Sequence, residues 1–298
     1  MCARPLFRDF AALVFLAVVS ALHPATAGTW TYTTAMKNML DFEGVILPGD
    51  DLRLAEMTKD EAPIYIGVDS EGGDIETGMR IGEILRKKEA YVTVRRCNSA
   101  CVFIYAGAAY REPPTRRPLV GVHRIFLGDL SADLTPEQVK ERYDTILAHI
   151  RQYLQRMNIA PEFLSFMQSF EPNEMHILTK AELKRFGFGE IDPIQAERNI
   201  AWKAKRIGVA SFELRSRYAR IQKECDDIRG ATTEQTGRMY DKCKATILYD
   251  ISPETYLKRR AQLDAIFDRC VKLGKHIDVD DGDDFTIGHG IPVKCVSD

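Results

Sequence analysis

The sequence predicts an α/β domain followed by a smaller α-helical domain, and three observations support this division. Residues 40–188 alternate short apolar runs with stretches of helical periodicity, which is the pattern of a sheet covered by helices. From about residue 201 the chain changes to charged helical stretches. That second part also holds four of the cysteines, which we expect to staple helical hairpins, although their spacing does not determine the pairing. The predicted domains span residues 28–200 and 201–298.

Length and composition leave room for one or two hydrophobic cores and exclude some partners. The chain has 298 residues, of which 45% are hydrophobic, and a formal net charge of −2 at pH 7. Because nucleic-acid binding needs a concentrated basic face, nucleic acid is not an expected partner. The cysteines form no CxxC pair that would indicate zinc or a redox site, so we expect no metal and no cofactor.

The first residues are typical of a secretory signal. Arg4 and Arg8 precede an apolar run at residues 10–22, and a small-residue stretch then ends at Ala27. We expect residues 1–27 to be removed by cleavage after Ala27, which places the protein in the periplasm or outside the cell. An uncleaved anchor is the alternative, although the apolar run is shorter than the roughly 20 residues of a membrane span.

The first part of the α/β domain contains two predicted strands, at residues 45–47 and 64–68. The second strand ends in the turn Ser70-Glu71-Gly72-Gly73, and apolar residues at helical spacing then predict a helix over residues 75–87. Asp74 stands where it would cap the first turn of that helix.

Two further predicted strands lead to the candidate catalytic residues. A strand at residues 91–94 leads to Ser99 and a small, apolar helix at residues 100–109, and a strand at residues 119–122 ends at His123. After a linker at residues 128–133, helical patterns occupy residues 135–157, 161–170, 179–186, 212–227 and 253–268.

Three features converge at the carboxyl ends of these strands, where α/β proteins bind their ligands. Gly72 and Gly73 leave backbone N–H groups at a helix start, which could hold an oxyanion or form only a structural turn. Ser99 begins a helix, as either a nucleophile or an N-cap. His123 could take the seryl proton near neutral pH, although a lone histidine at a strand end is usually structural.

These motifs together resemble the proteolytic subunit of Clp protease, and more closely its exported, ATPase-independent relatives. The resemblance spans about residues 45–192 and rests on Ser70-Glu71-Gly72-Gly73, Gly78-Met79, Cys97-Asn98-Ser99-Ala100-Cys101, Ala106-Gly107 and Val120-Gly121-Val122-His123. It implies a crotonase-like fold of stacked β-β-α units. It also implies Ser99 as nucleophile and His123 as general base. The oxyanion hole would consist of the Gly73 N–H, in the Gly72-Gly73 turn, and the Ala100 N–H, next to the serine.

The third member of the catalytic triad is uncertain at this level. In the resembled family an Asp orients the histidine, whereas the corresponding region here offers Asn173 and Glu174. Glu174 would also stabilise the imidazolium electrostatically, while Asn173 would only orient the ring. A site without a usable partner is a further possibility, and such a site would be less active.

Other residues near the site carry alternatives of their own. Glu71 would oppose an oxyanion unless its carboxylate points away. Cys97 and Cys101 bracket Ser99, which suggests a disulfide that fixes the turn, or else two small buried thiols. Lys140 could replace the histidine base, as a Lys does in related exported peptidases, but its surroundings look exposed and a catalytic Lys needs burial.

The leading prediction is a serine endopeptidase that acts on unfolded polypeptides or peptides and assembles as a homo-oligomer, the latter by resemblance. A catalytically inactive binding protein of the same fold is the main alternative. Acyl-CoA chemistry is disfavoured because export separates the protein from CoA. An acidic run at residues 278–284 invites a calcium site, but its glycine is out of register with an EF-hand loop, so a solvated loop is expected.

Overall fold

The computed structural model describes residues 28–33, 39–60, 64–112, 119–127, 134–229, 234–278, 288 and 294–296. The expected signal segment 1–27, the linker 128–133 and nearly all of the acidic run 278–284 lie outside these ranges. Within them, no helix combines the length and the hydropathy needed to cross a membrane. The same residues contain no cluster of three or more His, Cys, Asp or Glu side chains that could hold a metal ion.

The chain forms two compact units that meet between Glu190 and Ile191. The sequence placed a boundary at residues 200 and 201, which lie inside helix α7 (Pro193–Ile207). This helix begins early because Asp192 accepts hydrogen bonds from the N–H groups of Ile194 and Gln195, an N-cap that precedes Pro at the first helical position.

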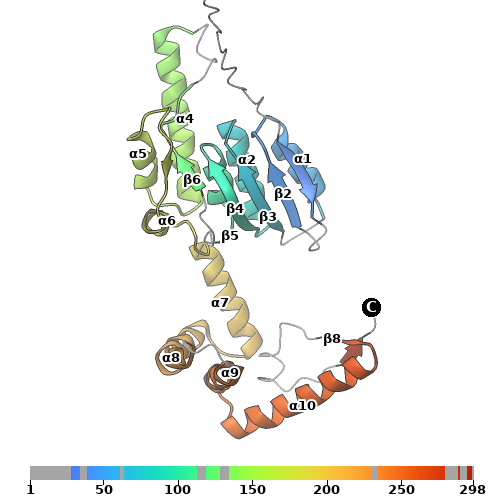
Figure 1. Cartoon of the computed structure of the whole chain (residues 1–298). Coiled ribbons are helices and arrows are strands. Elements are labelled where there is room, and N and C mark those ends of the chain that lie inside the picture. Colours follow the sequence, from blue (N-terminus) through green and yellow to red (C-terminus); the bar gives the residue numbers. More distant parts are fainter. Residues whose placement is uncertain are drawn as a thin grey trace, which may run out of the picture. The chain divides into compact units, whose positions relative to one another are not determined.

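The first unit is mixed α/β and is built on a seven-stranded sheet in which β2, β3, β4 and β6 run parallel. The strand order is β1-β2-β3-β4-β6-β7, with β5 paired to β4, and β1 and β7 are antiparallel at the two edges (Figure 1). The strands are β1 (Thr29–Tyr32), β2 (Met39–Glu43), β3 (Tyr65–Ser70), β4 (Tyr91–Asn98), β5 (Tyr110–Arg111), β6 (Leu119–Val122) and β7 (His176–Ile177).

In the described part of the first unit six helices accompany the sheet, and Figure 1 shows α1 and α2 packed along its strands. They are α1 (Asp50–Met57), α2 (Ile75–Lys87), α3 (Cys101–Gly107), α4 (Pro136–Arg156), α5 (Glu162–Gln168) and α6 (Lys180–Phe186). The expected helices α2 to α6 and strands β3, β4 and β6 are confirmed, with ends shifted by a few residues. Asp74 caps α2 as expected, since its carboxylate accepts from the Thr77 N–H at 2.8 Å.

The expected strand at residues 45–47 is wrong, and β1, β2 and α1 were not foreseen. Ile46 instead makes a single bridge: its N–H donates to Gly72 O at 2.8 Å, and its carbonyl accepts from Asp74 N at 2.9 Å. Both partners lie in the glycine turn after β3, so Ile46 ties that turn to the chain. The apolar triplet is too short to extend the ladder, because Pro48-Gly49 turns the chain into α1.

The core lies between the sheet and the helices. Ile66 and Val68 of β3 and Val92 and Val94 of β4 are buried on the covered face, while alternate residues face outward, as the two-residue period of a strand requires. Every residue of α3 is buried. Glycines permit close packing of α2 on α3, since a Cβ at Gly107 would lie 2.2 Å from Gly82 Cα.

A β-bulge changes the direction of side chains at the end of β4. Val68 pairs with Val94, but Asp69 pairs with Arg96, so β4 has one additional residue at this point. Such an insertion exchanges the two faces of a strand. Consequently Cys97, opposite Ser70, turns toward the covered face, while Arg96 stands beside Asp69 on the other face.

Among its described residues, the second unit has the four helices α7 to α10 and, contrary to the expectation of helices alone, a two-stranded antiparallel sheet. Its elements are α7, α8 (Ser211–Arg229), α9 (Glu234–Tyr249), α10 (Pro253–Lys272), β8 (His276–Asp278) and β9 (Lys294–Val296). Disulfides join Cys225 to Cys243 between α8 and α9, and Cys270 to Cys295 between α10 and β9. Its apolar core includes Leu214, Leu248 and Leu263.

Candidate active site

Ser99 occupies a tight turn between β4 and α3. Its φ is +53°, in the left-handed region that residues other than glycine adopt rarely and that recurs at active sites. The turn is held on both sides, because Ser99 N–H donates to Gly121 O at 2.8 Å and Val102 N–H donates to Ser99 O at 3.1 Å. The hydroxyl is therefore presented from a defined, strained position between a strand end and a helix start.

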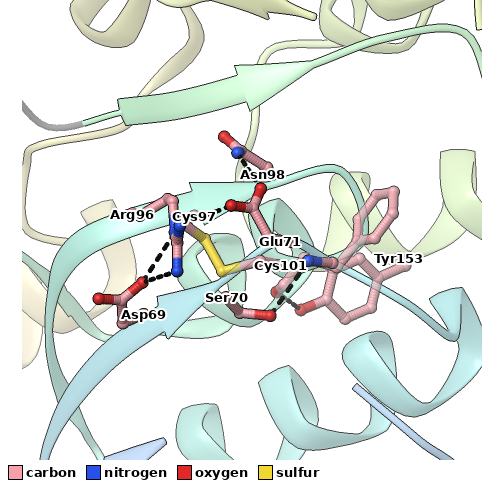
Figure 2. Close-up of a disulfide and its surroundings, with 10 residues drawn as sticks. Asp69, Ser70, Glu71, Arg96, Cys97, Asn98, Cys101 and Tyr153 are labelled. Atoms are coloured by element: carbon pink, nitrogen blue, oxygen red, sulfur yellow. Dashed lines mark hydrogen bonds and ion pairs between the residues drawn. A yellow bond between two sulfur atoms is a disulfide. The ribbon is translucent and has the colours of Figure 1, made fainter. Parts of the chain in front are cut away.

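A disulfide between Cys97 and Cys101 brackets this turn. Both cysteines are fully buried, and they connect the end of β4 to the first residue of α3. In Figure 2 the bridge lies beside Tyr153 of α4, whose hydroxyl donates to Phe103 O at 2.5 Å. Burial raises the pKa of Tyr153, which therefore stays a neutral donor and ties α4 to α3.

His123 lies within hydrogen-bond distance of Ser99. The distance between His123 Nε2 and Ser99 Oγ is 2.8 Å, and only 9% of the histidine is exposed. The two residues are 24 positions apart in sequence, yet β4 and β6 are parallel neighbours that pair Asn98 with Gly121. Since parallel strands end at the same edge of a sheet, the residues that follow them meet there.

The other ring nitrogen of His123 is bound by a backbone group. His123 Nδ1 lies 2.7 Å from the carbonyl oxygen of Arg124. A carbonyl can only accept, so this bond assigns the proton of a neutral ring to Nδ1. Nε2 is then free to accept from the Ser99 hydroxyl, which is the arrangement that a general base needs.

The structure does not bring Asn173 or Glu174 to His123. Both are exposed in the segment between α5 and β7, and neither makes a hydrogen bond to the ring within the described ranges. The expectation that one of them orients the ring meets a physical obstacle, because the Arg124 carbonyl already accepts from Nδ1. Arg124 was missed because a backbone carbonyl leaves no signal in a sequence.

The glycine turn presents N–H groups beside the serine. Gly72 N–H donates to Ser70 Oγ at 3.1 Å and is thereby occupied. Among the residues that the structure describes, the N–H groups of Gly73 and Ala100 donate to no protein acceptor. Gly73, Ala100, Ser99 and His123 all line one pocket. Two free donors next to a nucleophile can stabilise an oxyanion.

Both glycines are required by geometry. Their φ values are +104° for Gly72 and +139° for Gly73, which side chains rarely adopt. A Cβ at Gly72 would lie 2.7 Å from Ser99 Cβ and 2.8 Å from Asn98 O, and a Cβ at Gly73 would lie 2.2 Å from Ile46 O. The absence of these side chains is what lets the turn approach the serine.

The pocket in front of the serine has a volume of about 920 Å³. Its walls come from the glycine turn, the starts of α2 and α3, the segment after β6 and the first half of α4. Its apolar lining consists of Ile75, Phe103, Ile125, Phe126, Leu127, Leu134, Ile146 and Met167. Polar and charged residues line the rest of it, among them Asp74, Glu76, Gln138, Glu141 and Arg142. A pocket of this size can hold a side chain and part of an extended backbone.

The Glu71 carboxylate beside the turn is bound by a network of partners, drawn in Figure 2. Arg96 Nη1 lies 2.6 Å from Glu71 Oε1, and Asn98 Nδ2 donates to Glu71 Oε2 at 2.7 Å. Arg96 also donates to Asp69 through Nε and Nη2, at 2.9 and 2.8 Å. The expected conflict between Glu71 and an oxyanion is thus reduced by an adjacent cation.

Lys140 does not enter the site. It is exposed on α4 and forms an i,i+4 ion pair with Asp144. The hydrogen bond that Lys140 Nζ donates to the Asp144 carboxylate raises the pKa of Lys140, whereas a catalytic lysine needs a lowered one. Nothing in this arrangement favours Lys140 over His123 as a base.

Comparison with known proteins adds little. No protein-family model matches the chain, and no curated protein matches it. Among solved structures it is similar to ClpP1 from Listeria monocytogenes, with 18% sequence identity, over 50% of this chain and 87% of that chain. The TM-score is 0.38, and a similarity at this level says nothing about the activity of the present chain.

Proposed function

We propose that the chain is an exported, ATP-independent serine peptidase of the Clp-protease type, with Ser99 as nucleophile and His123 as general base. The observation that carries this proposal is the 2.8 Å contact between His123 Nε2 and Ser99 Oγ. A seryl hydroxyl is a poor nucleophile until a neighbouring base takes its proton, and an imidazole with a free Nε2 can do so.

The proposed reaction follows from the positions of the donors and acceptors. Ser99 Oγ attacks the carbonyl carbon of a peptide bond while its proton passes to His123 Nε2. The carbonyl oxygen becomes an oxyanion, which the N–H groups of Gly73 and Ala100 receive. The C–N bond then breaks, and His123 returns the proton to the leaving amine. Water repeats the sequence on the acyl-enzyme and releases Ser99.

The remaining parts of the proposal rest on the sequence motifs and on supporting features of the first unit. We assign it a crotonase-like fold of stacked β-β-α units and assembly as a homo-oligomer, both by the Clp resemblance. The paired glycines, the serine and the histidine follow neighbouring strands in the order that this resemblance implies. Three disulfides support a site of action in an oxidising compartment. This support is independent of the expectation that residues 1–27 are a cleaved signal.

An inactive binding protein of the same fold is the alternative. It would be favoured if the Ser99 hydroxyl lay beyond reach of any base, and the 2.8 Å distance to His123 argues against that. The carbonyl that accepts from His123 Nδ1 affects the expected rate of peptide hydrolysis. Unlike a carboxylate it carries no full charge to stabilise the imidazolium, so we expect a slow peptidase.

Labelling with a fluorophosphonate tests the proposal, because this reagent phosphonylates only activated serines. We expect the wild type to be labelled, Ser99→Ala to be unlabelled, and His123→Ala to be labelled at least about 100 times more slowly. Ser169→Ala and His149→Ala remove an exposed serine and an exposed histidine, and should label like the wild type. A folded, disulfide-bonded wild type without a Ser99-dependent adduct would contradict the proposal.

A further inference from the structure

The feature that the peptidase mechanism leaves unexplained is the partner of His123 Nδ1, which is a main-chain oxygen rather than a side chain. We infer that Arg124 is the positioning residue of His123. Its carbonyl orients the imidazole, and its guanidinium fixes that carbonyl by binding the carboxyl end of α5. The orientation of the ring stands on geometry alone, whereas its consequence for rate rests on the peptidase function proposed above.

The carbonyl contact depends on the backbone of a single residue. The acceptor of His123 Nδ1 belongs to the next residue in the chain, so the 2.7 Å contact requires the Arg124 peptide to turn back toward the ring. Residues 123–127 belong to no helix or strand, and therefore no ladder of hydrogen bonds holds this peptide. Something other than secondary structure must select its orientation.

The Arg124 side chain supplies that restraint. Its Nε lies 3.1 Å from Phe170 O and 3.3 Å from Gln168 O, and its Nη2 lies 2.8 Å from a Glu171 carboxylate oxygen. The two carbonyls belong to the last residue of α5 and the chain that follows it, where a cation is favoured by the helix dipole.

The anchor itself is rigid. Phe163, Leu164 and Met167 of α5 are buried in the main core, with exposed fractions of 0%, 5% and 2%. The guanidinium thus joins the irregular segment after β6 to a helix whose apolar side chains are buried in the core. The position of Arg124 is therefore fixed twice: its guanidinium is bound at the carboxyl end of α5, and its backbone follows directly on the end of β6.

The carbonyl contacts matter more than the ion pair. Arg124 and Glu171 are 38% and 61% exposed, and ion pairs in contact with water contribute little. A lysine could keep the charge and reach Glu171, but a single ammonium cannot reproduce the planar fork that binds two carbonyls and a carboxylate together. The inference therefore predicts a graded effect of substitution, with Lys between Arg and Ala.

Two measurements on the full chain separate orientation from rate. ¹⁵N NMR of a histidine-labelled sample identifies the tautomer of His123 and the exchange rate of its Nδ1–H, with His123→Ala providing the assignment among six histidines. Fluorophosphonate labelling and peptide hydrolysis report the rate. The matched control is Arg217→Ala in the second unit. Like Arg124, Arg217 contacts both a backbone carbonyl, Leu248 O at 2.8 Å, and a glutamate, Glu213.

In Arg124→Ala we expect Nδ1–H exchange to accelerate at least about 10-fold and kcat to fall about 10- to 100-fold, because the base is misaligned. We expect KM to rise by a smaller factor, because Ile125 and Phe126 of the same segment line the pocket. Arg124→Lys should recover part of both, and Arg217→Ala should match the wild type. A His123 signal in Arg124→Ala that equals the wild type would overturn the inference. If that signal responds but the wild type is never labelled, the inference stands and the peptidase function fails.

Discussion

Replacing Gly72 by alanine tests whether the approach of the glycine turn to Ser99 controls reactivity. The substitution adds one methyl group at the point where the turn after β3 meets the turn after β4. Gly49→Ala is a matched control, because Gly49 has nearly the same φ, +99° against +104°, but a Cβ there would meet nothing within 4 Å. The two variants share backbone strain and differ in steric contact.

The magnitudes follow from these contacts. Backbone strain should cost about 1–3 kcal/mol of unfolding free energy in both variants. At Gly72 the new Cβ would lie 2.7 Å from Ser99 Cβ, about 0.7 Å short of ordinary contact, and such overpacking adds about 1–3 kcal/mol. If Ser99 yields by most of that distance, its hydroxyl leaves His123, and a misplacement near 1 Å can slow a reaction by about 100-fold.

Unfolding free energy and the reactivity of Ser99 can both be measured in the same Trp202→Phe variant. The chain has two tryptophans, and Trp202→Phe removes the one in the second unit, which is 51% exposed, so that Trp30 fluorescence follows urea unfolding of the first unit. Fluorophosphonate labelling gives the reactivity of Ser99. We expect labelling to slow about 10- to 100-fold in Gly72→Ala and to stay within about twofold of the wild type in Gly49→Ala. Equal labelling rates in the two variants would refute the steric reasoning.

Three further predictions concern the disulfide beside Ser99, the ion pair of Glu71 and the capping box of α6. The double variant Cys97→Ala with Cys101→Ala should lose about 2 kcal/mol of unfolding free energy, measured in urea, and should label more slowly. The control Cys225→Ala with Cys243→Ala opens a longer loop, so it should lose about 3 kcal/mol but label at the wild-type rate. Arg96→Met leaves the Glu71 carboxylate without its cation beside the pocket, so labelling should slow at low ionic strength and recover in high salt; a rate independent of salt would contradict this. Burial raises the pKa of Glu182, but hydrogen bonds from Thr179 and His176 outweigh it and lower that pKa below 4.5. Glu182→Gln should therefore cost about 1 kcal/mol at pH 7, and urea titrations should show the difference shrinking as pH falls below about 4.5.

Much of the first unit could be predicted from periodicity. The strand before Ser70, the helix after Asp74 and the strand before His123 each combine a regular apolar pattern with a recognisable end signal. Ser99 and His123 could be paired in advance because both follow strands of one sheet. The proximity of the glycine turn follows from the same rule.

The parts that could not be predicted depend on single backbone positions. The bulge in β4 turns Cys97 toward Cys101, and no residue pattern announces it. The bridge made by Ile46 was read as a strand because three apolar residues resemble one. The orienting group of His123 was sought among side chains, whereas the structure supplies the carbonyl of Arg124. The pairing of Arg96 with Glu71 likewise depends on which face the bulge selects.

We propose that Ser99 and His123 cleave peptide bonds, and digestion of an unfolded polypeptide tests this proposal. The disulfide-bonded chain would be incubated with reduced, alkylated casein without ATP, and new termini would be identified by mass spectrometry. We expect cleavage by the wild type, none by Ser99→Ala, and cleavage by Ser169→Ala at the wild-type rate. Absence of new termini with the folded wild type, or equal cleavage by Ser99→Ala, would contradict it.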